Sequence, residues 1–526
     1  MATTGNSESV VAAAVTPAEL EMAIIRTSTA AAPPPPPPTK KETDTDPFLV
    51  KFDEPYDAQN PLDWPTGRKW LVTDVLSATG FNRIMVSTIM APALPSIAKE
   101  LHMSDTEAAM SLSIYLLATA FGPLAIGPLS ELYGRQVVLH ASGIWFFVWN
   151  LVCGFASTKE TLIASRFLAG FGASAIYSLA GGVLGDIWRP EHRGRSLGMY
   201  LLIPLLGAAV GPIIGGFMAE RTTWRWMFWS TSIFQGVMVV VSFFSFFETY
   251  APVVLQRRAA KIRKETGNDR YHTATEELNE GKSSVAILKQ ALTRPLRLLA
   301  FHPLIQVSSL LTGFNYGIMY VTLSTFSHLW TKQYGQSVEI SGLHYIACSL
   351  GEIAGAQIGG PLMDYFYKRQ TTENRSPEAR IPLMYPGIVL TWGGVLMYGW
   401  TAQSHTHWTV VDLGVFIMLF GMQLDDLPLI GYIIDVYGEH TSSAMGAQQF
   451  FKSLAAFLFP LFAPAMYDKL GYGKGNSILA IEGKSKVDRM KRLYDPSFAA
   501  AITGRSFLVA PLGAPGIAGR VRHTTI

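Results

Sequence analysis

The chain has 526 residues, of which 49% are hydrophobic and 15% are charged, well below the roughly 25% of charged residues in a typical soluble domain. Its net charge of +3, with the bases in loops, gives no sign of a nucleic-acid-binding surface. Its two cysteines lie in apolar stretches, which argues against a disulfide framework. Between the charges run apolar windows of about twenty residues, the length that crosses a hydrocarbon core about 30 Å thick. The composition therefore predicts an all-α, multi-pass membrane protein.

The chain is expected to form two helical bundles behind a polar N-terminal segment. Residues 1–56 should be a disordered cytoplasmic tail, because they are rich in small and polar residues and contain the run Pro33–Pro38. An N-terminal six-helix bundle is predicted over 57–248, a cytoplasmic central loop over 249–299, and a C-terminal bundle of helices 7–11 over 300–480. The predicted helices cover residues 70–95, 110–132, 137–156, 161–186, 196–219, 226–247, 300–328, 342–366, 382–401, 409–436 and 443–467.

Basic residues are distributed unequally between alternate loops, which sets the orientation of a membrane protein. The loops on one side hold Arg135, Arg189, Arg193, Arg195, Lys368, Arg369, Arg375 and Arg380. The loops on the other side hold Lys99, Lys159, Arg221, Arg225 and Lys332. This asymmetry predicts that the first side and the N-terminus face the cytosol. The basic stretch Gln256–Lys264 in the central loop is expected either to lie against anionic lipid or to form a solvated helix.

The C-terminal segment does not show the twelfth helix that would balance the two halves. The stretch Glu482–Arg489 is too charged to cross a bilayer. The later stretch Phe498–Gly519 is apolar but contains Arg505, prolines and glycines. We therefore predict that helix 12 is missing or degenerate and that 481–526 form an atypical C-terminal segment.

A nine-residue stretch at the end of the second predicted helix occurs twice in the chain. Gly127–Arg135 reads GPLSELYGR, and Gly360–Arg369 repeats its small, acidic and basic positions in the same order. A repeat of this kind within apolar helices indicates duplication. The residues of interest are Gly127, Glu131, Gly134 and Arg135 in the first copy and Asp364 and Lys368 in the second. Opposite charges at the cytoplasmic end of a helix can pair with each other or with a neighbouring loop. Alternatively, these residues only end the helix, and their charges only set its orientation in the membrane.

A second stretch, Gly207–Gly216, combines small residues with a proline inside the fifth predicted helix. Small residues four apart allow a neighbouring helix to approach closely, and proline removes a backbone donor and permits a bend. Such a helix suits either a sliding contact or static close packing. The residues concerned are Gly207, Gly211, Pro212, Gly215 and Gly216.

Several charged residues fall at membrane depth, where a charge is costly unless it is paired or hydrated. They are Arg83, Arg166, Glu352, Asp425, Asp426 and Lys452. The depths of Asp425 and Lys452 make an ion pair feasible, and only one of the adjacent residues Asp425 and Asp426 is expected to face the cavity. We expect at least one of the three carboxylates to titrate; the alternative is a static charge pair. The seventh helix presents Asn315, Tyr316 and Tyr320, a polar and aromatic wall that suits either an organic substrate or ordinary packing.

Cofactor and metal sites are not expected. His405 and His407 have no further ligands nearby in the sequence, so a metal site is not predicted. The stretch Gly483-Lys484-Ser485 lacks the glycine spacing and the strand–turn–helix context of a phosphate-binding loop, which argues against export driven by ATP.

Taken together, these motifs resemble those of the major facilitator superfamily, and specifically its fungal, twelve-helix drug:proton antiporter branch. The resemblance covers about residues 57–480 and rests on Gly127–Arg135, with Glu131 where aspartate is commoner, on Arg166, on Gly207–Gly216 and on Glu248–Pro252. It implies two six-helix bundles related by a pseudo-twofold axis with a cavity between them. It also implies a conformational latch at Gly127–Arg135, a part for Arg166 in proton coupling, and export as the direction associated with Gly207–Gly216.

The expected function is proton-coupled efflux of small apolar organic compounds, such as a drug, toxin or secondary metabolite, by a transporter that is not an enzyme. The expected partners are the small-molecule substrate, protons and the lipid bilayer, with no nucleic acid and no cofactor. The protein is expected to be a monomer of the plasma membrane. Two alternatives stay open: a transporter of polyamines or other organic cations, and a transport-inactive membrane sensor or scaffold.

Overall fold

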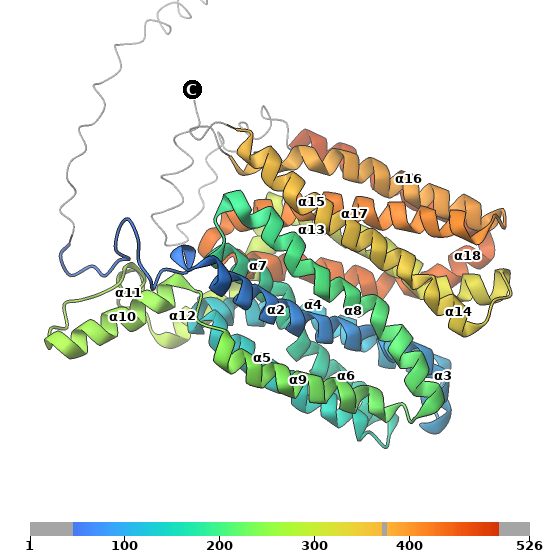
Figure 1. Ribbon diagram of the computed structural model, residues 1–526, viewed down its shortest axis with the longest axis horizontal. Coiled ribbons are helices and arrows are strands. Elements are labelled where there is room, and N and C mark those ends of the chain that lie inside the picture. The colour runs from blue at the N-terminus through green and yellow to red at the C-terminus, as the bar shows by residue number, and fades with distance from the viewer. Residues whose placement is uncertain (1–45, 371–375, 494–526) are drawn as a thin grey trace, which may run out of the picture. The chain divides into compact units, whose positions relative to one another are not determined.

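The computed structural model describes residues 46–370 and 376–493 (Figure 1). The chain divides into two compact units, Met1–Leu49 and Val50–Ile526, and the helices described here belong to the second. Its described residues form helices joined by turns, so the all-α prediction is confirmed. Residues 1–45, which make up most of the predicted tail, lie outside the described residues, as do 371–375.

The first six membrane helices follow the apolar stretches of the sequence. They are α2 (Thr66–Thr88), α4 (Asp105–Tyr133), α5 (Arg135–Gly154), the pair α6 (Lys159–Ala173) and α7 (Ala175–Ile187), α8 (Arg193–Arg221) and α9 (Arg225–Ser245), with the short α3 (Leu94–Glu100) after α2. A capping box of Ser104 and Glu107 starts α4. Gly134, with φ of 98°, ends it and turns the chain directly into α5.

The central loop is more ordered than its polar composition indicated. It contains α10 (Ala251–Thr266), α11 (Ala274–Leu278) and α12 (Ser284–Phe301). Arg258 of α10 bonds Asp57 at 2.5 Å, and Arg263 bonds Glu276 at 2.9 Å. Burial raises the pKa of Asp57, but backbone N–H groups and the Arg258 guanidinium outweigh that effect and lower it. The bases expected to meet lipid are thus largely engaged in ion pairs within the protein.

The second set of helices repeats the first. It consists of α13 (Pro303–His328), extended by a π-helical turn (Leu329–Gln333), the short α14 (Val338–Leu343) leading into α15 (Tyr345–Lys368), α16 (Met384–Gln403) after a 3-10 turn (Pro377–Leu383), α17 (Trp408–Tyr437) and α18 (Thr441–Leu493). Within the described residues, seven helical stretches are long and apolar enough to cross a membrane. Large apolar side chains on the outer sides of the helices are exposed, as a lipid-facing surface requires, among them Ile233, Phe244 and Val389.

A helix follows Gly471 at the place of the twelfth helix, but its part before the charged stretch, residues 472–481, is too short to cross a bilayer, in line with a degenerate helix 12. Gly471, with φ of 75° and ψ of 168°, breaks α18 into two helices. After the break, Tyr472 stacks on Tyr467 with ring centroids 4.3 Å apart, and Asn476 accepts a hydrogen bond from the Tyr467 hydroxyl. Trp400 of α16 donates to the Ser477 hydroxyl. The charged stretch after 481 continues this helix to Leu493. Phe498–Gly519 lies outside the described residues.

The two halves meet along two symmetric pairs of helices, α4 with α18 and α8 with α15. Glycines bring the backbones together at both contacts. A Cβ atom on Gly127 would lie 2.6 Å from the Ser442 carbonyl oxygen, and one on Gly198 would lie 2.6 Å from that of Ala356. Such contacts have no space for a larger residue at these positions and fix how the halves approach each other.

Candidate functional site

The site has two parts, which lie at different depths between the halves. We call the end that holds Glu131, Arg135 and Asp364 the Arg135 end, and the end that holds Arg221 and α14 the Arg221 end. At the Arg135 end the halves are joined by hydrogen bonds. Between that end and the Arg221 end lies a cavity.

Glu131, at the last turn of α4, binds the start of α18 in the other half. Its carboxylate accepts hydrogen bonds from the backbone N–H of Ser443 at 2.7 Å and from the Ser443 hydroxyl at 2.6 Å. The Arg294 guanidinium of α12 donates to the same carboxylate at 2.7 Å. A carboxylate suits this place because the N-terminus of a helix carries unpaired N–H groups and a partial positive charge.

Arg135, at the start of α5, is fully buried and joins four elements. Its guanidinium bonds Asp186 at the end of α7 at 3.1 Å, and also donates to the hydroxyls of Ser130 and Ser442 at 2.7 Å. Its backbone N–H donates to Glu248, which lies against Gly134 where a larger residue would collide. Glycine at 134 is therefore required both by its positive φ and by this contact.

The second half builds the same arrangement with partly different residues. Asp364 accepts from the backbone N–H groups of Gly194 at 2.7 Å and Arg195 at 2.8 Å, at the start of α8. Arg380 is fully buried and bonds Asp435 at the end of α17 at 2.8 Å. Arg193, from the other half, bonds the second oxygen of Asp435.

Arg380 therefore occupies the place in the second half that Arg135 occupies in the first. Lys368, which the sequence repeat puts at that position, is exposed and lies 3.5 Å from His192. The arginine comes instead from the turn Pro377–Leu383, twelve positions further along the chain than Lys368. The sequence places Arg193 and Arg380 among the bases of the predicted cytoplasmic loops but gives no sign that they join the site. Arg294, in the middle of α12, is not predicted at all.

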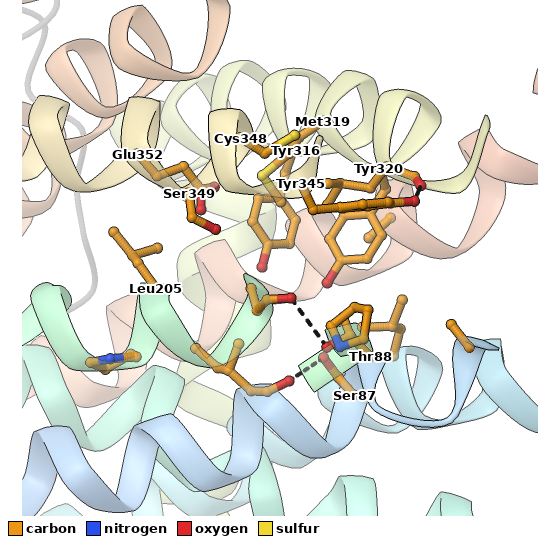
Figure 2. A pocket seen from close by; sticks show the side chains of 18 of the residues that line it. Ser87, Thr88, Leu205, Tyr316, Met319, Tyr320, Tyr345, Cys348, Ser349 and Glu352 are labelled. Atoms are coloured by element: carbon orange, nitrogen blue, oxygen red, sulfur yellow. Dashed lines mark hydrogen bonds between the residues drawn. The ribbon is translucent and has the colours of Figure 1, made fainter. Parts of the chain in front are cut away.

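A cavity of about 1480 Å³ lies between the halves (Figure 2). Its walls come from α2, α4, α7 and α8 on one side and from α13, α15, α17 and α18 on the other. In Figure 2, Tyr316, Tyr320 and Glu352 face Ser87, Thr88 and Leu205 across the space. The lining is mostly apolar and aromatic, with few polar groups, as in sites that hold small organic molecules.

The cavity is open towards the Arg221 end. Its lining there includes Phe217, Arg221, Ile340 and Leu343, all of which are exposed. Towards the Arg135 end the lining stops at Leu197 and Met445, beyond which the buried hydrogen bonds of Glu131 and Asp364 join the halves.

The charged residues of the second half are differently placed around the cavity. Glu352 lines it, is 8% exposed, and receives no hydrogen bond or ion pair from the described part of the chain. Asp426 also lines it and bonds Lys452 at 2.7 Å. Asp425 points away and accepts hydrogen bonds from the Asn315 side chain at 3.1 and 3.3 Å. Lys452 thus pairs with Asp426 and not with Asp425, whose predicted depth matches that of Lys452.

Arg83 and Arg166, two buried arginines at membrane depth in the first half, do not line the cavity. Arg166 donates to the backbone carbonyls of Val86 and Ser111 and lies 4.6 Å from the Tyr115 ring. Arg83 is 2% exposed, and none of its three guanidinium nitrogens has a hydrogen-bond partner in the described residues. Both side chains lie inside the first bundle.

The small residues of α8 pack against α2 within the same bundle. A Cβ atom on Gly207 would lie 2.6 Å from the Phe81 carbonyl oxygen, and one on Gly211 would lie 2.5 Å from the Thr88 hydroxyl. A Cβ atom on Gly215 would collide with the Ile89 carbonyl, whereas Gly216 and Pro212 line the cavity. Among the predicted wall residues, Asn315, Tyr316 and Tyr320 all reach the cavity. The described residues contain no cluster of three or more potential metal ligands.

Comparison with known proteins agrees with this geometry. The profile of the Major Facilitator Superfamily matches residues 76–460. The chain belongs to this superfamily. It is 56% identical over 395 residues to the "Probable efflux pump mfs2" of Aspergillus flavus, a match that covers 74% of this chain and 93% of that protein. It is 40% identical to the "Efflux pump vrtL" of Penicillium aethiopicum over 84% of this chain and 87% of that protein.

Solved structures of the superfamily share the fold. The proton:xylose symporter XylE aligns with a TM-score of 0.63 at 15% identity, over 82% of this chain and 96% of its own. The human organic anion transporter MFSD10 aligns with a TM-score of 0.57 at 17% identity, over 80% and 99% of the two chains. The chain is therefore an integral, multi-pass membrane transporter with the major facilitator fold and a small-molecule substrate.

Proposed function

We propose that the protein exports small, largely apolar organic compounds in exchange for protons. The observation that carries the proposal is the cavity of about 1480 Å³, which is mostly apolar and aromatic, is open at one end, and contains a carboxylate that none of the described residues pairs with. The relatives named as efflux pumps support export as the direction.

The proposed orientation places the Arg135 end in the cytosol and the Arg221 end outside. The bases of the short loops gather at the Arg135 end, as the cytoplasmic side of membrane proteins requires. The conformation described here is then outward-facing, with its cytoplasmic side closed by Glu131, Asp364 and their partners. We place the protein in the plasma membrane as a monomer with a cytoplasmic N-terminus.

Glu352 is the proposed site of proton exchange. This carboxylate lies in an apolar wall without a partner among residues 46–370 and 376–493. It has two ways to avoid an isolated charge: it can bind a proton or lie beside the substrate. Binding of substrate from the cytosolic side would release the proton, and protonation from the outside would release the substrate. The Asp426–Lys452 pair is already compensated, so we assign it to holding α17 and α18 together, with Asp426 able to contact substrate.

Rocking of the halves would carry the cavity from one side to the other. The hydrogen bonds at the Arg135 end join helix starts in one half to carboxylates in the other, so they must break when that end opens. Glu131 and Asp364 then act as the two latches of the closed state, one at each contact between the halves.

Reconstituted vesicles with an imposed pH gradient test the proposal. Uptake is followed into vesicles in which the protein is inserted inside-out, so that its cytosolic side faces the medium. The substrates are the uncharged dye Nile red, the cationic dye rhodamine 6G and labelled spermidine. We expect Nile red or rhodamine 6G to accumulate only when the interior is acidic, and the Glu352→Gln variant to lose that dependence. Accumulation that ignores the gradient would contradict proton coupling, and a lack of any flux would favour the sensor or scaffold alternative.

One observation favours a second candidate function, the transport of organic cations. Glu352 is the one cavity-lining carboxylate without a partner in the described part of the chain, and Tyr316, Tyr320 and Tyr345 line the same wall. Aromatic faces and a carboxylate together attract cations. Accumulation of spermidine in the same vesicles, without that of Nile red, would select this function.

A further inference from the structure

The helix α12 has three faces of different character, and the exposed apolar one has no partner in the described residues. Successive residues of a helix lie about 100° apart, so Val285, Leu292 and Leu296 share one strip along α12. Val285 is 75% exposed and Leu296 is 52% exposed. Phe301, in the last turn, is 74% exposed but points to another side of the helix, about 160° from Val285. Water-exposed apolar side chains of this size in a row mark a binding surface.

The second face of α12 is polar and borders the apolar strip. Lys289 and Arg297 are exposed on it, with Thr293 between them. The third face is buried: Ala291, Pro295 and Leu298 pack against the protein, where α12 contacts α4 and α18. A helix that is packed on one side, apolar on the next and basic on the third has the pattern of helices that lie in a membrane surface.

The position of α12 selects the membrane as its partner. The helix ends at Phe301 and is followed at Pro303 by α13, a helix of the transporter body, whose Leu310 is exposed on the outside. The apolar strip is therefore continuous along the chain with the surface that lipid covers. Figure 1 shows α10, α11 and α12 gathered at the same end of the helices. The exposed Lys289 and Arg297 suit an anionic headgroup layer.

We propose that α12 binds the surface of the adjacent leaflet through Val285, Leu292 and Leu296, and that Arg294 transmits this contact to Glu131. Arg294 lies on the protein side of α12 and donates to Glu131 at 2.7 Å, within 3.2 Å of His440. It is the contact that joins α12 to the latch of the first half. An α12 held on the lipid surface keeps Arg294 in place and favours the closed Arg135 end.

Lipid quenching tests the membrane contact without any need for transport. In a Cys153→Ala, Cys348→Ala background, an environment-sensitive fluorophore is attached at Leu296→Cys and, as the control, at Ala286→Cys, an exposed position on the polar side. The protein is placed in phosphatidylcholine vesicles with and without phosphatidylserine, and quencher is carried by brominated lipid. We expect quenching at 296 that exceeds that at 286 and increases with phosphatidylserine. Equal quenching at both positions would overturn the proposal and would mean that the apolar strip binds a soluble partner and not lipid.

Modification of Cys348 tests the link to the latch. Cys348 lines the cavity, so in a Cys153→Ala background an impermeant thiol reagent added from the Arg221 side reports how often the cavity faces that side. We expect Val285→Ser with Leu296→Ser, and separately Arg294→Ala, to slow modification several-fold. Val389→Ser, at an equally exposed apolar position on α16, is the matched control and should leave the rate unchanged. Slowing by Val389→Ser alone, or by none of the variants, would overturn the link.

Discussion

The Arg135 end and the cavity both place charged residues between the two halves, but they treat those charges in opposite ways. At the Arg135 end Glu131, Asp364 and Asp435 each have two or more donors, most of them from the other half. In the cavity Glu352 has none from the described residues. Fully bonded charges fix a structure, whereas an uncompensated one remains available for a proton or a ligand. The difference separates the part of the molecule that holds a conformation from the part that does the exchange.

The largest effect on stability is expected from Arg380, at the bonded end. Its replacement by methionine leaves Asp435 with one of its two arginines and removes the Arg380 guanidinium that lies 3.7 Å from Asp364. Removing one partner of a buried pair typically costs about 3–5 kcal/mol. Thermal unfolding in detergent should show this loss for Arg380→Met.

Lys368 provides the control for Arg380. Because Lys368 is exposed, Lys368→Met should change the free energy of unfolding by no more than about 0.5 kcal/mol. Equal destabilisation by the two variants would mean that the sequence repeat, and not the buried contact, identifies the functional base.

A smaller effect is expected from Glu131→Gln, which keeps the shape of the side chain and removes its charge. Hydrogen bonds to a charged group contribute about 1.5–3 kcal/mol each, part of which the neutral amide retains. The variant should open the Arg135 end more often, measured as slower modification of Cys348 from the Arg221 side. Glu131→Asp keeps the charge, so its rate of Cys348 modification should lie between those of the unaltered protein and Glu131→Gln. If Cys348 is modified as fast in Glu131→Gln as in the unaltered protein, there is no latch at this position.

Much of this arrangement could be predicted from the sequence, and the failures have physical causes. Apolar windows located the helices, and the repeat located Glu131 and Asp364, because both signals are local in the chain. Arg380 could not be found in this way, since it reaches Asp435 across a turn that the repeat does not include. The packed turns near Tyr472 and Asn476 could not be predicted either, because they precede a charged stretch and are too short to give an apolar window. Whether Asp425 or Asp426 faces Lys452 depends on the rotation of α17 about its axis. The spacing of apolar residues in the sequence fixes that rotation only to within about one residue.

The smallest effect is expected within the cavity, at the Asp426–Lys452 pair. Its side chains are 26% and 10% exposed, so solvent weakens the attraction. A double-mutant cycle with Asp426→Asn and Lys452→Met should give a coupling energy of about 0.5–1 kcal/mol in thermal unfolding. The matched control is a second cycle in which Asp425→Asn takes the place of Asp426→Asn. It should show no coupling to Lys452. Coupling of Lys452 to Asp425 alone would mean that α17 is rotated relative to the structure described here.

Proton release upon addition of substrate tests the central claim most directly. Vesicles that contain inside-out protein, an acidic interior and a trapped pH-sensitive dye receive rhodamine 6G or Nile red, whichever the flux assay shows to be transported. The account predicts that the interior becomes more alkaline with the unaltered protein and that this response is lost in Glu352→Gln, while Asp425→Asn retains it. An undiminished response in Glu352→Gln would contradict the assignment of proton exchange to the cavity carboxylate.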